Sequence, residues 1–232
     1  MATPIENRQN RGRVTVRVPI DPDRDCRLCP RLAAFRDENR RQNPEWFNSP
    51  VPIFGNADAG LVIIGLAPGM QGANRTGRPF TGDYAGDLLF GTLLKAGLAN
   101  GVYKRHPDDG LTLHNTMIVN AVRCVPPKNK PVGAEISQCR QFLAATLDAV
   151  GRPRTFVALG RIAHDSLLTT LGHRRSDYKF AHAARHDLSD GSTLFDSYHC
   201  SRYNTNTGRL TTDMFEDVVF AAARHTGQVP ES

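Results

Sequence analysis

Residues 61–65 read LVIIG, a short apolar run that ends in glycine and leads into a loop rich in glycine and proline. An unbroken apolar run of this length is typical of a strand that is buried on both faces of a parallel sheet. Two similar runs follow at residues 116–122 (TMIVNAV) and 155–160 (TFVALG), and a weaker one lies at residues 193–198. We therefore expect a central, mainly parallel sheet of four strands.

Segments with helical periodicity lie between and after these runs. Their apolar residues recur at helical spacing over residues 87–98, 134–150, 161–171 and 211–225. Strands that alternate with helices in this way predict a single-domain, doubly wound α/β fold in which helices flank the sheet. Ligands of such folds bind outside the carboxyl ends of the strands, so the loops after Gly65, Val122 and Tyr198 should converge on one cleft.

Length and composition agree with one globular domain. The chain has 232 residues, enough to bury a core, with 40% hydrophobic and 22% charged residues. The best apolar run, residues 59–70, is interrupted by Pro68 and Gly69 and is too short to cross a bilayer. Residues 1–20 contain scattered arginines with no apolar stretch behind them, unlike a secretory signal. We expect an N-terminal extension over residues 1–20, a domain over residues 21–228, and a cytoplasmic protein with no membrane contact.

The charge balance is basic. There are 29 Lys and Arg residues against 23 Asp and Glu residues, a formal net charge of +6. Arginine dominates this surplus, and its planar guanidinium binds phosphate in a bidentate fashion. The surplus is compatible with a nucleic-acid partner, although many basic proteins bind none.

Four of the five cysteines have a spacing suited to a metal centre. Cys26 and Cys29 form a C-x2-C pair, while Cys124 and Cys139 are separated by fourteen residues. An odd total argues against a framework made only of disulfides. Four thiolates can bind zinc or an iron–sulfur cluster, and because zinc ribbons usually repeat the close pair, the open second pair favours iron–sulfur. The alternative is a set of independent buried thiols.

The first of the three loops, residues 65–83 (GLAPGMQGANRTGRPFTGD), matches neither of the common nucleotide-binding fingerprints. Its glycines, beginning with Gly65, allow backbone amides to approach a ligand closely. Side chains suited to phosphate, to a flat ring and to proton transfer follow, namely Arg75, Arg78, Phe80 and Asp83. A generic glycine-rich turn is the alternative interpretation.

The other two loops are also polar. Asn120 comes at the end of the second strand, and an amide can read the edge of a nucleobase, although a polar residue there more often caps a turn. The third loop, residues 199–210 (HCSRYNTNTGRL), opens with His199 and carries Arg202 and Arg209 within reach of phosphates. A single histidine is a weak signal of function by itself.

Taken together, the motifs resemble those of the family-5 (B-type) uracil-DNA glycosylases. They are G-L-A-P-G followed by G-R-P-F-T-G-D, then N-A-V-R-C, then H-x-S-R-x-N-T-x-T-G-R-L, and the resemblance extends from Cys26 to about Asp213. The four cysteines also fit this resemblance, because families 4 and 5 both look like carriers of a [4Fe–4S] cluster on cysteines of such spacing. The resemblance therefore implies that Cys26, Cys29, Cys124 and Cys139 ligate one [4Fe–4S] cluster, with Cys200 outside it.

The resemblance also implies roles for the loop residues. Phe80 would stack on the extruded base, and Asn120 would contact its edge. Asp83 would position or activate water and steady the cationic sugar, and His199 would stabilise the charge that develops on the base. Ala67 would form part of an apolar pocket wall, as in family 5, where family 4 has a glutamate.

Contacts to DNA are expected from Arg75, Arg78, Ser201, Arg202 and Arg209. Two positions depart from the family pattern: Gln71 stands where a histidine is expected, and Cys200 where a proline is expected after His199. The second departure puts the stiffness of the DNA-inserting loop in question.

We interpret the chain as a monofunctional, monomeric DNA glycosylase of base excision repair. It is expected to excise uracil and other deaminated bases, hypoxanthine among them, and to leave an abasic site. The three motifs contain no lysine, so a Schiff-base step is not indicated. One alternative is a non-catalytic iron–sulfur module that binds DNA or abasic sites and would not need Asp83. Another is an enzyme acting on free nucleosides, against which the arginines of all three loops argue.

Overall fold

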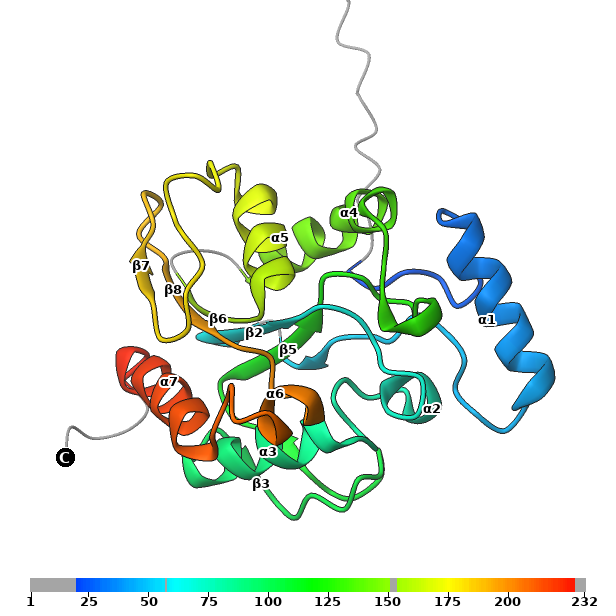
Figure 1. Cartoon of the computed structure of the whole chain (residues 1–232), viewed down its shortest axis with the longest axis horizontal. Helices are drawn as coiled ribbons and strands as arrows, with labels where there is room; N and C mark the ends of the chain where they lie inside the picture. Colours follow the sequence, from blue (N-terminus) through cyan, green and yellow to red (C-terminus); the bar gives the residue numbers. More distant parts are fainter. Residues whose placement is uncertain (1–19, 57, 151–153, 228–232) are drawn as a thin grey trace, which may run out of the picture.

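A mixed α/β fold is seen in the computed structural model, which describes residues 20–56, 58–150 and 154–227. A six-stranded sheet in the order β1-β5-β2-β6-β8-β7 runs through the middle of this part of the chain (Figure 1). Its four central strands are parallel and buried throughout: β2 (Leu61–Gly65), β5 (Thr116–Asn120), β6 (Thr155–Leu159) and β8 (Thr193–Ser197). The predicted parallel core is confirmed. The predicted extension over residues 1–20 lies outside the described residues except for Ile20.

The prediction of four strands is too low. Two edge strands, β1 (Phe54–Gly55) and β7 (Arg185–Asp187), pair antiparallel with β5 and β8. They are two and three residues long, so neither is long enough to show the alternation by which a strand is recognised in a sequence. A separate small ribbon joins β3 (Ala99–Asn100) to β4 (Thr112–Leu113).

Helices cover both faces of the sheet (Figure 1). On one face α3 (Tyr84–Lys95) and α7 (Thr212–His225) pack with Leu61 and Ile63 of β2 in the larger core. On the other face α4 (Gly133–Val150) and α5 (Arg161–Leu171) pack with Val62 and Ile64. Alternate residues of one strand are thus buried in two different cores, which explains why its sequence is continuously apolar.

The predicted helices are confirmed, with one shift. The helix expected over residues 87–98 begins at Tyr84, because the side chain of Asp83 caps it by accepting a hydrogen bond from the amide of Gly86. It ends before Gly97, which has a φ of +69°.

One long helix, α1 (Pro30–Gln42), was not expected. Its buried face contains Leu32 and Ala33 but also Arg36 and Asn39, so the apolar periodicity that marks an amphipathic helix is missing. Three shorter elements sit in the loops: α2 (Ala73–Thr76), η1 (Pro127–Asn129) and α6 (Arg202–Asn206). Among the helices of the described residues, none is long and apolar enough to cross a membrane.

Candidate active site

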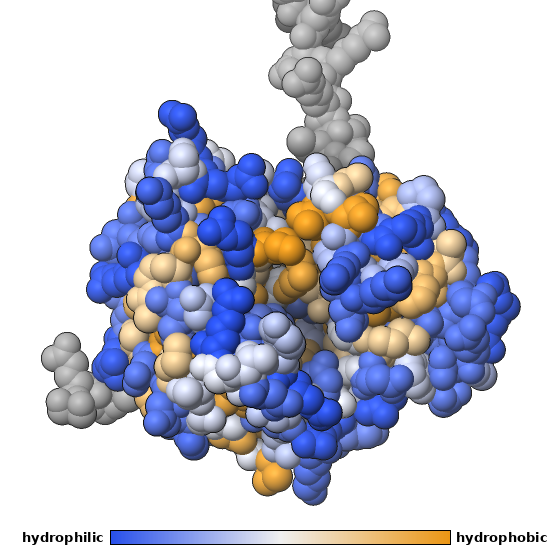
Figure 2. Space-filling model, in the orientation of Figure 1, coloured by the Kyte–Doolittle hydropathy of each residue, from blue (hydrophilic) through white to orange (hydrophobic). Residues whose placement is uncertain are grey.

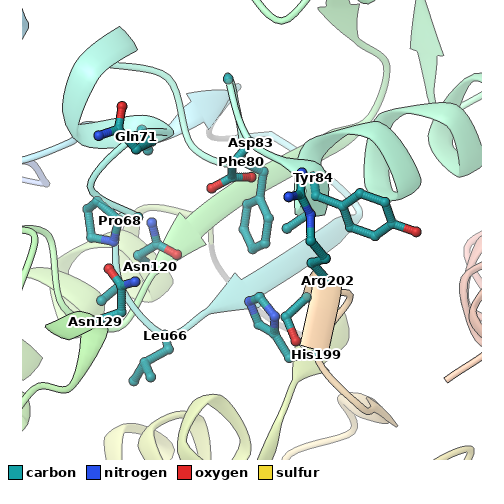
Figure 3. A pocket seen from close by; sticks show the side chains of 16 residues that line it. Leu66, Pro68, Gln71, Phe80, Asp83, Tyr84, Asn120, Asn129, His199 and Arg202 are labelled. Atoms are coloured by element: carbon teal, nitrogen blue, oxygen red, sulfur yellow. The ribbon is translucent and has the colours of Figure 1, made fainter. Parts of the chain in front are cut away.

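The three polar loops meet in one cleft of about 560 Å³ at the carboxyl ends of the parallel strands. The first loop forms one wall, Asn120 follows from β5, and residues after β8 close the site from the other side (Figure 3). Figure 2 shows a recess near the middle of the face seen in Figure 1, between α2 and α6, with hydrophobic residues on one wall. The predicted convergence of the loops is confirmed.

The floor of the cleft is formed by main chain at Gly65. The register of the sheet places this residue opposite Asn120 on the neighbouring strand. A Cβ at position 65 would lie 2.8 Å from Cζ of Phe80 and closer still to the amide oxygen of Asn120. Only glycine therefore allows the Phe80 ring and the Asn120 amide to reach the strand end together.

Phe80 is held in an unusual backbone conformation. Its φ is +55°, which is costly for an aromatic residue and is typical of functional sites. The hydroxyl of Tyr103 donates a hydrogen bond to the Phe80 carbonyl at 3.2 Å and accepts one from the amide of Gly82. The Phe80 ring stacks on the ring of His199, with centroids 5.9 Å apart and an interplanar angle of 27°. The sequence placed Phe80 here but gave no sign of its conformation.

Asn120 presents an unsatisfied polar atom to the site. The residue is only 3% exposed, and its Oδ1 has no hydrogen-bond partner among the described residues. Leaving a buried acceptor without a partner costs about 1–3 kcal/mol. A ligand with an N–H group at this position would remove that cost, so Asn120 is suited to read the edge of a base.

Asp83 combines two functions. Its side chain caps α3, and its carboxylate also lies against the backbone of the first loop, where a Cβ on Gly72 would collide with it. Burial raises the pKa of Asp83, while hydrogen bonds from the amides of Gly86 and Ala85 partly oppose the increase. The carboxylate is thus fixed in place and is a stronger proton acceptor than an exposed aspartate.

His199 lies beside the Phe80 ring. Burial lowers the pKa of His199 to about 4, so the imidazole is neutral at neutral pH. The side-chain amide of Asn204 donates to the His199 carbonyl at 2.8 Å and fixes the start of the third loop. A neutral imidazole can donate one N–H hydrogen bond, and it carries no positive charge before the reaction begins.

The expected DNA contacts fall into two groups, of which the first reaches the surface of the protein. Ser201 caps α6 by accepting a hydrogen bond from the amide of Asn204, and Arg202 lines the cleft with its guanidinium 5.5 Å from the Tyr84 ring. Arg75 on α2 and Arg209 after α6 are exposed. All of these are accessible to a phosphate backbone.

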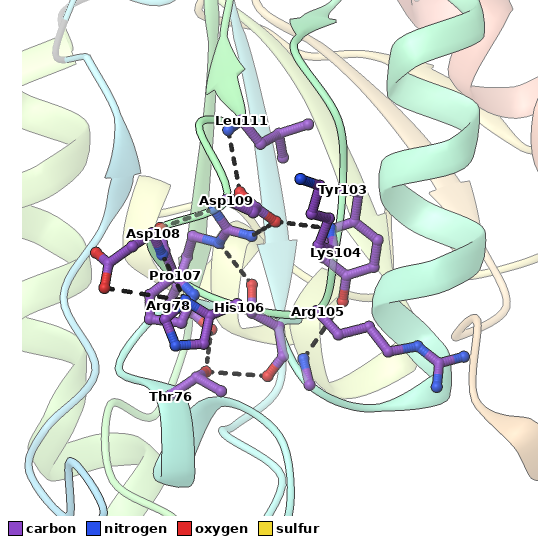
Figure 4. Close-up of polar contacts among 12 residues, drawn as sticks. Thr76, Arg78, Tyr103, Lys104, Arg105, His106, Pro107, Asp108, Asp109 and Leu111 are labelled. Atoms are coloured by element: carbon purple, nitrogen blue, oxygen red, sulfur yellow. Dashed lines mark hydrogen bonds and ion pairs between the residues drawn. The ribbon is translucent and has the colours of Figure 1, made fainter.

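Arg78 belongs to the second group, and the expectation that it contacts a phosphate is wrong. It is 6% exposed, and its two terminal nitrogens donate to the carboxylate of Asp109, both at 2.8 Å (Figure 4). Its Nε donates to the hydroxyl of Thr81 at 2.7 Å. The bidentate guanidinium holds the pKa of Asp109 well below its usual range. Arg78 is therefore a structural cation that fastens the first loop to the segment before β4.

Three polar residues that line the cleft were not assigned from the sequence: Gln71, Tyr84 and Asn129. Asn129 stands out because η1 brings it there from the proline-rich segment after β5, with a φ of +55°. Nothing in the composition of that segment shows which way it turns. No lysine is among the described residues that line the cleft.

The four cysteines of the predicted metal centre line one small, buried pocket. They come from the segment before α1, from the segment after β5 and from α4: Cys26, Cys29, Cys124 and Cys139. Burial, followed by the neighbouring Cys139, raises the pKa of Cys124 to about 12, and burial raises that of Cys29 to about 11. Ala67 of the first loop packs among the same side chains as these cysteines, so the pocket adjoins the cleft.

Donor groups surround these sulfurs. The amide of Arg123 donates to Sγ of Cys139 at 3.4 Å, and Nη1 of Arg36 lies 3.9 Å from Sγ of Cys124. Arg36 is 1% exposed and, in the part of the chain that the structure describes, makes no ion pair and has an unpartnered Nε. A buried cation without a carboxylate fits an anionic group held by the four sulfurs. Cys200 lies apart from them, in the larger core, with its Sγ 3.5 Å from the Ala85 carbonyl.

Comparisons with known proteins agree with this geometry. A model of the "Uracil DNA glycosylase superfamily" matches residues 52–223. The chain is 46% identical over 208 residues to the type-5 uracil-DNA glycosylase of Thermus thermophilus, covering 87% of this chain and 94% of that protein. It is 38% identical over 207 residues to the type-5 enzyme of Pyrobaculum aerophilum, covering 88% and 90%. It is also 40% identical over 211 residues to that of Mycobacterium bovis, covering 87% and 78%.

Proposed function

The chain belongs to the uracil-DNA glycosylase superfamily and is a DNA N-glycosylase that excises uracil, and we propose that it also excises hypoxanthine and acts without a lyase step. The cleft volume of about 560 Å³ supports a site that takes a purine as well as a pyrimidine. Its recognising side chains are mainly amides, which offer both donors and an acceptor and so tolerate different base edges. The absence of lysine among the described lining residues supports release of an abasic site as the product.

Catalysis begins with extrusion of the damaged nucleotide from the duplex, which costs a few kcal/mol. Leu66 and Ala67 line one wall of the cleft. The base then enters between the Phe80 ring and this wall, where Asn120 contacts its edge. Stacking on an aromatic ring and satisfying a buried amide both favour the extruded state.

Breaking the glycosidic bond leaves positive charge on the deoxyribose and negative charge on the base. Asp83 is the carboxylate of the first loop, and it supplies the negative group that steadies the sugar cation and accepts the proton of the attacking water. His199 donates a hydrogen bond toward the base as its negative charge grows. The observation that carries this assignment is the placement of the two groups in one cleft with the electrostatic properties each task needs: a fixed, more basic carboxylate and a neutral imidazole.

We further propose that Cys26, Cys29, Cys124 and Cys139 hold a [4Fe–4S] cluster with a structural purpose. When bound, the cluster would tie the segment before α1 to the segment after β5 and to α4. Support comes from the shared pocket, the thiol donor set and the buried, carboxylate-free Arg36 beside it. No step of the excision reaction passes through this group.

The protein is also proposed to work as a monomer in the cytoplasm. Its large exposed hydrophobic residues come from separate segments of the described chain rather than from one element: Leu28, Phe47, Val102, Val132, Ile162 and Tyr203. Such scattered residues are ordinary on a monomer.

The assignment of Asp83 is tested by substitution. Asp83→Asn keeps the size of the side chain and a capping oxygen for α3 but removes the negative charge and the proton acceptor. We expect the single-turnover excision rate on duplexes with one uracil or one hypoxanthine to fall about 10²–10⁴-fold. Binding of the same duplexes, measured by fluorescence anisotropy, should be retained.

The product assay completes this test. Strand breaks should appear only after alkali treatment, since an intact abasic strand is the expected product. Excision by Asp83→Asn at the wild-type rate would remove Asp83 from the mechanism. Strand cleavage without alkali would contradict the proposed absence of a lyase step, and an inert hypoxanthine duplex would restrict the substrate range to uracil.

A further inference from the structure

A second concave surface lies beside the cleft, between α5 and residues 172–184, the returning segment that leads from the end of α5 to β7. This α5 groove has a volume of about 810 Å³ and is lined in part by Arg161, Arg174, Arg175 and Lys179. The only carboxylate among the described lining residues is that of Asp165, which is 3.7 Å from Arg175. The groove therefore carries a surplus of positive charge.

These cations are available to a partner. Arg161, Arg174, Arg175 and Lys179 are all exposed, and within the described residues only Arg175 makes an ion pair. In Figure 2 most of the residues over the segment that follows α5 are hydrophilic. Free arginines in a groove form the electrostatic footprint expected of a phosphate-binding surface.

The α5 groove begins next to the active site. Arg161 follows Gly160, where an added Cβ would lie 3.7 Å from Cβ of His199. The guanidinium of Arg161 is 5.9 Å from the Phe180 ring, which is 6.2 Å from the ring of Tyr198. One end of the groove thus touches the start of the third loop, and α5 leads away from it.

The returning segment is anchored by a buried network. Nε2 of His164 on α5 donates to the carbonyl of Tyr178 at 2.9 Å, and its Nδ1 donates to the carboxylate of Asp196 on β8 at 2.8 Å. Nε2 of His186 donates to the other oxygen of Asp196 at 3.0 Å. Tyr178 lies directly before Lys179, so the network anchors the backbone of this segment against α5.

We propose that the α5 groove binds the phosphate backbone of the duplex that flanks the extruded nucleotide. This inference rests on the proposed reading of the cleft as the site that holds the extruded base. Eleven helical residues span about 16 Å, which corresponds to about five base pairs along a duplex axis. The groove thereby extends the enzyme's footprint on one side of the lesion beyond the reach of the three loops.

The test replaces Arg174, Arg175 and Lys179 together with glutamine. On a 30-base-pair uracil duplex we expect the Kd to rise about 10- to 100-fold at low salt, and the slope of log K against log salt to become shallower by about two to three. The single-turnover rate at saturating enzyme should stay within about twofold, because the cleft is untouched. Excision of uracil from a five-nucleotide single strand with a central uracil, too short to reach the groove, should also be unchanged.

Two further variants make the result decisive. Arg24, Lys104 and Arg224 are exposed cations that line neither the cleft nor the groove, and replacing these three with glutamine should leave the Kd nearly unchanged. The exchange Arg174→Lys, Arg175→Lys and Lys179→Arg keeps the charge and should keep the binding. If the groove variant binds the duplex with wild-type affinity and salt slope, the proposal is overturned, whatever its single-turnover excision rate. A wild-type protein that excises uracil from neither the five-nucleotide strand nor the duplex overturns the assignment of the cleft instead.

Discussion

Two titratable groups in the cleft have pKa values shifted in opposite directions by the same cause. Burial disfavours the charged form of each, which raises the pKa of Asp83 and lowers that of His199 to about 4. The carboxylate therefore holds its proton to a higher pH than usual, while the imidazole loses its proton at a lower pH than usual. Environment alone makes one group a better proton acceptor and the other a neutral donor.

This pair predicts the pH dependence of excision. The single-turnover rate should be flat from neutral to mildly alkaline pH and should fall on the acid side, as Asp83 becomes protonated through its raised pKa. No titration near pH 6.5 should appear, because His199 is already neutral there. Rates measured from pH 4.5 to 9 on a uracil duplex check this, and a rate that declines as pH rises through 6–7 would require a protonated His199.

Single residues also show where sequence reasoning reached its limit. Phe80, Asp83, Asn120 and His199 were placed correctly in one cleft, because strand ends bring their loops together whatever lies between. Arg78 was misassigned because its partner, Asp109, is 31 residues away and nothing in a linear pattern reveals a buried ion pair. Exposure decides whether an arginine can meet a phosphate, and exposure is a tertiary property.

At the scale of elements, the buried strands and amphipathic helices were readable and the polar helix α1 was not. Continuous apolar runs and a period of 3.6 residues are local signals, so they survive in the sequence. The buried face of α1 instead contains Arg36 and Asn39. Such a face packs on polar groups from other parts of the chain, and Arg36 here contacts the carbonyl of Cys26 and Sγ of Cys124. A local sequence pattern cannot predict contacts of this kind.

The attachment of α1 gives a prediction about metal content. Wild-type protein purified without oxygen should contain about four irons per chain, as the [4Fe–4S] composition requires. Arg36→Met should lower that content and speed the loss of visible colour in a chelator, because the buried cation beside the thiolates is gone. Arg41→Met is the matched control on the same helix, where Arg41 is exposed and pairs with Glu38.

Two outcomes would contradict this view of α1. Stoichiometric zinc in place of iron would change the identity of the metal group. Iron retention by Arg36→Met equal to that of the control would show that the guanidinium does not stabilise the group.

At the scale of the whole molecule, the His164 network joins α5, β7, β8 and the returning segment. Burial lowers the pKa of His164, but the hydrogen bond and charge of Asp196 and the carbonyl of Tyr178 outweigh it, and the net pKa is raised. Both ring nitrogens face acceptors, so the folded state favours the imidazolium form. Asp165 and His186 are the other titratable groups near this ring.

The raised pKa predicts a pH-dependent contribution to stability. It should be fully present below about pH 6.5, the unfolded value, and should be lost as pH rises through the higher folded value. The difference in urea midpoint between wild type and His164→Gln should therefore be largest near pH 5.5 and should shrink toward pH 9. A difference that is constant over this range would mean that the ring acts only through packing.

The main-chain floor of the cleft at Gly65 limits how this site can change by mutation. Every amino acid that a single base change at a glycine codon can produce carries a Cβ, and a Cβ at this position displaces both Phe80 and the Asn120 amide. The base preference can therefore change only by substitutions in the walls of the cleft. Leu66 and Asn129 are such positions, because their side chains border the cleft without supporting its floor. New base preferences in such a chain would arise by substitution around a floor that does not change.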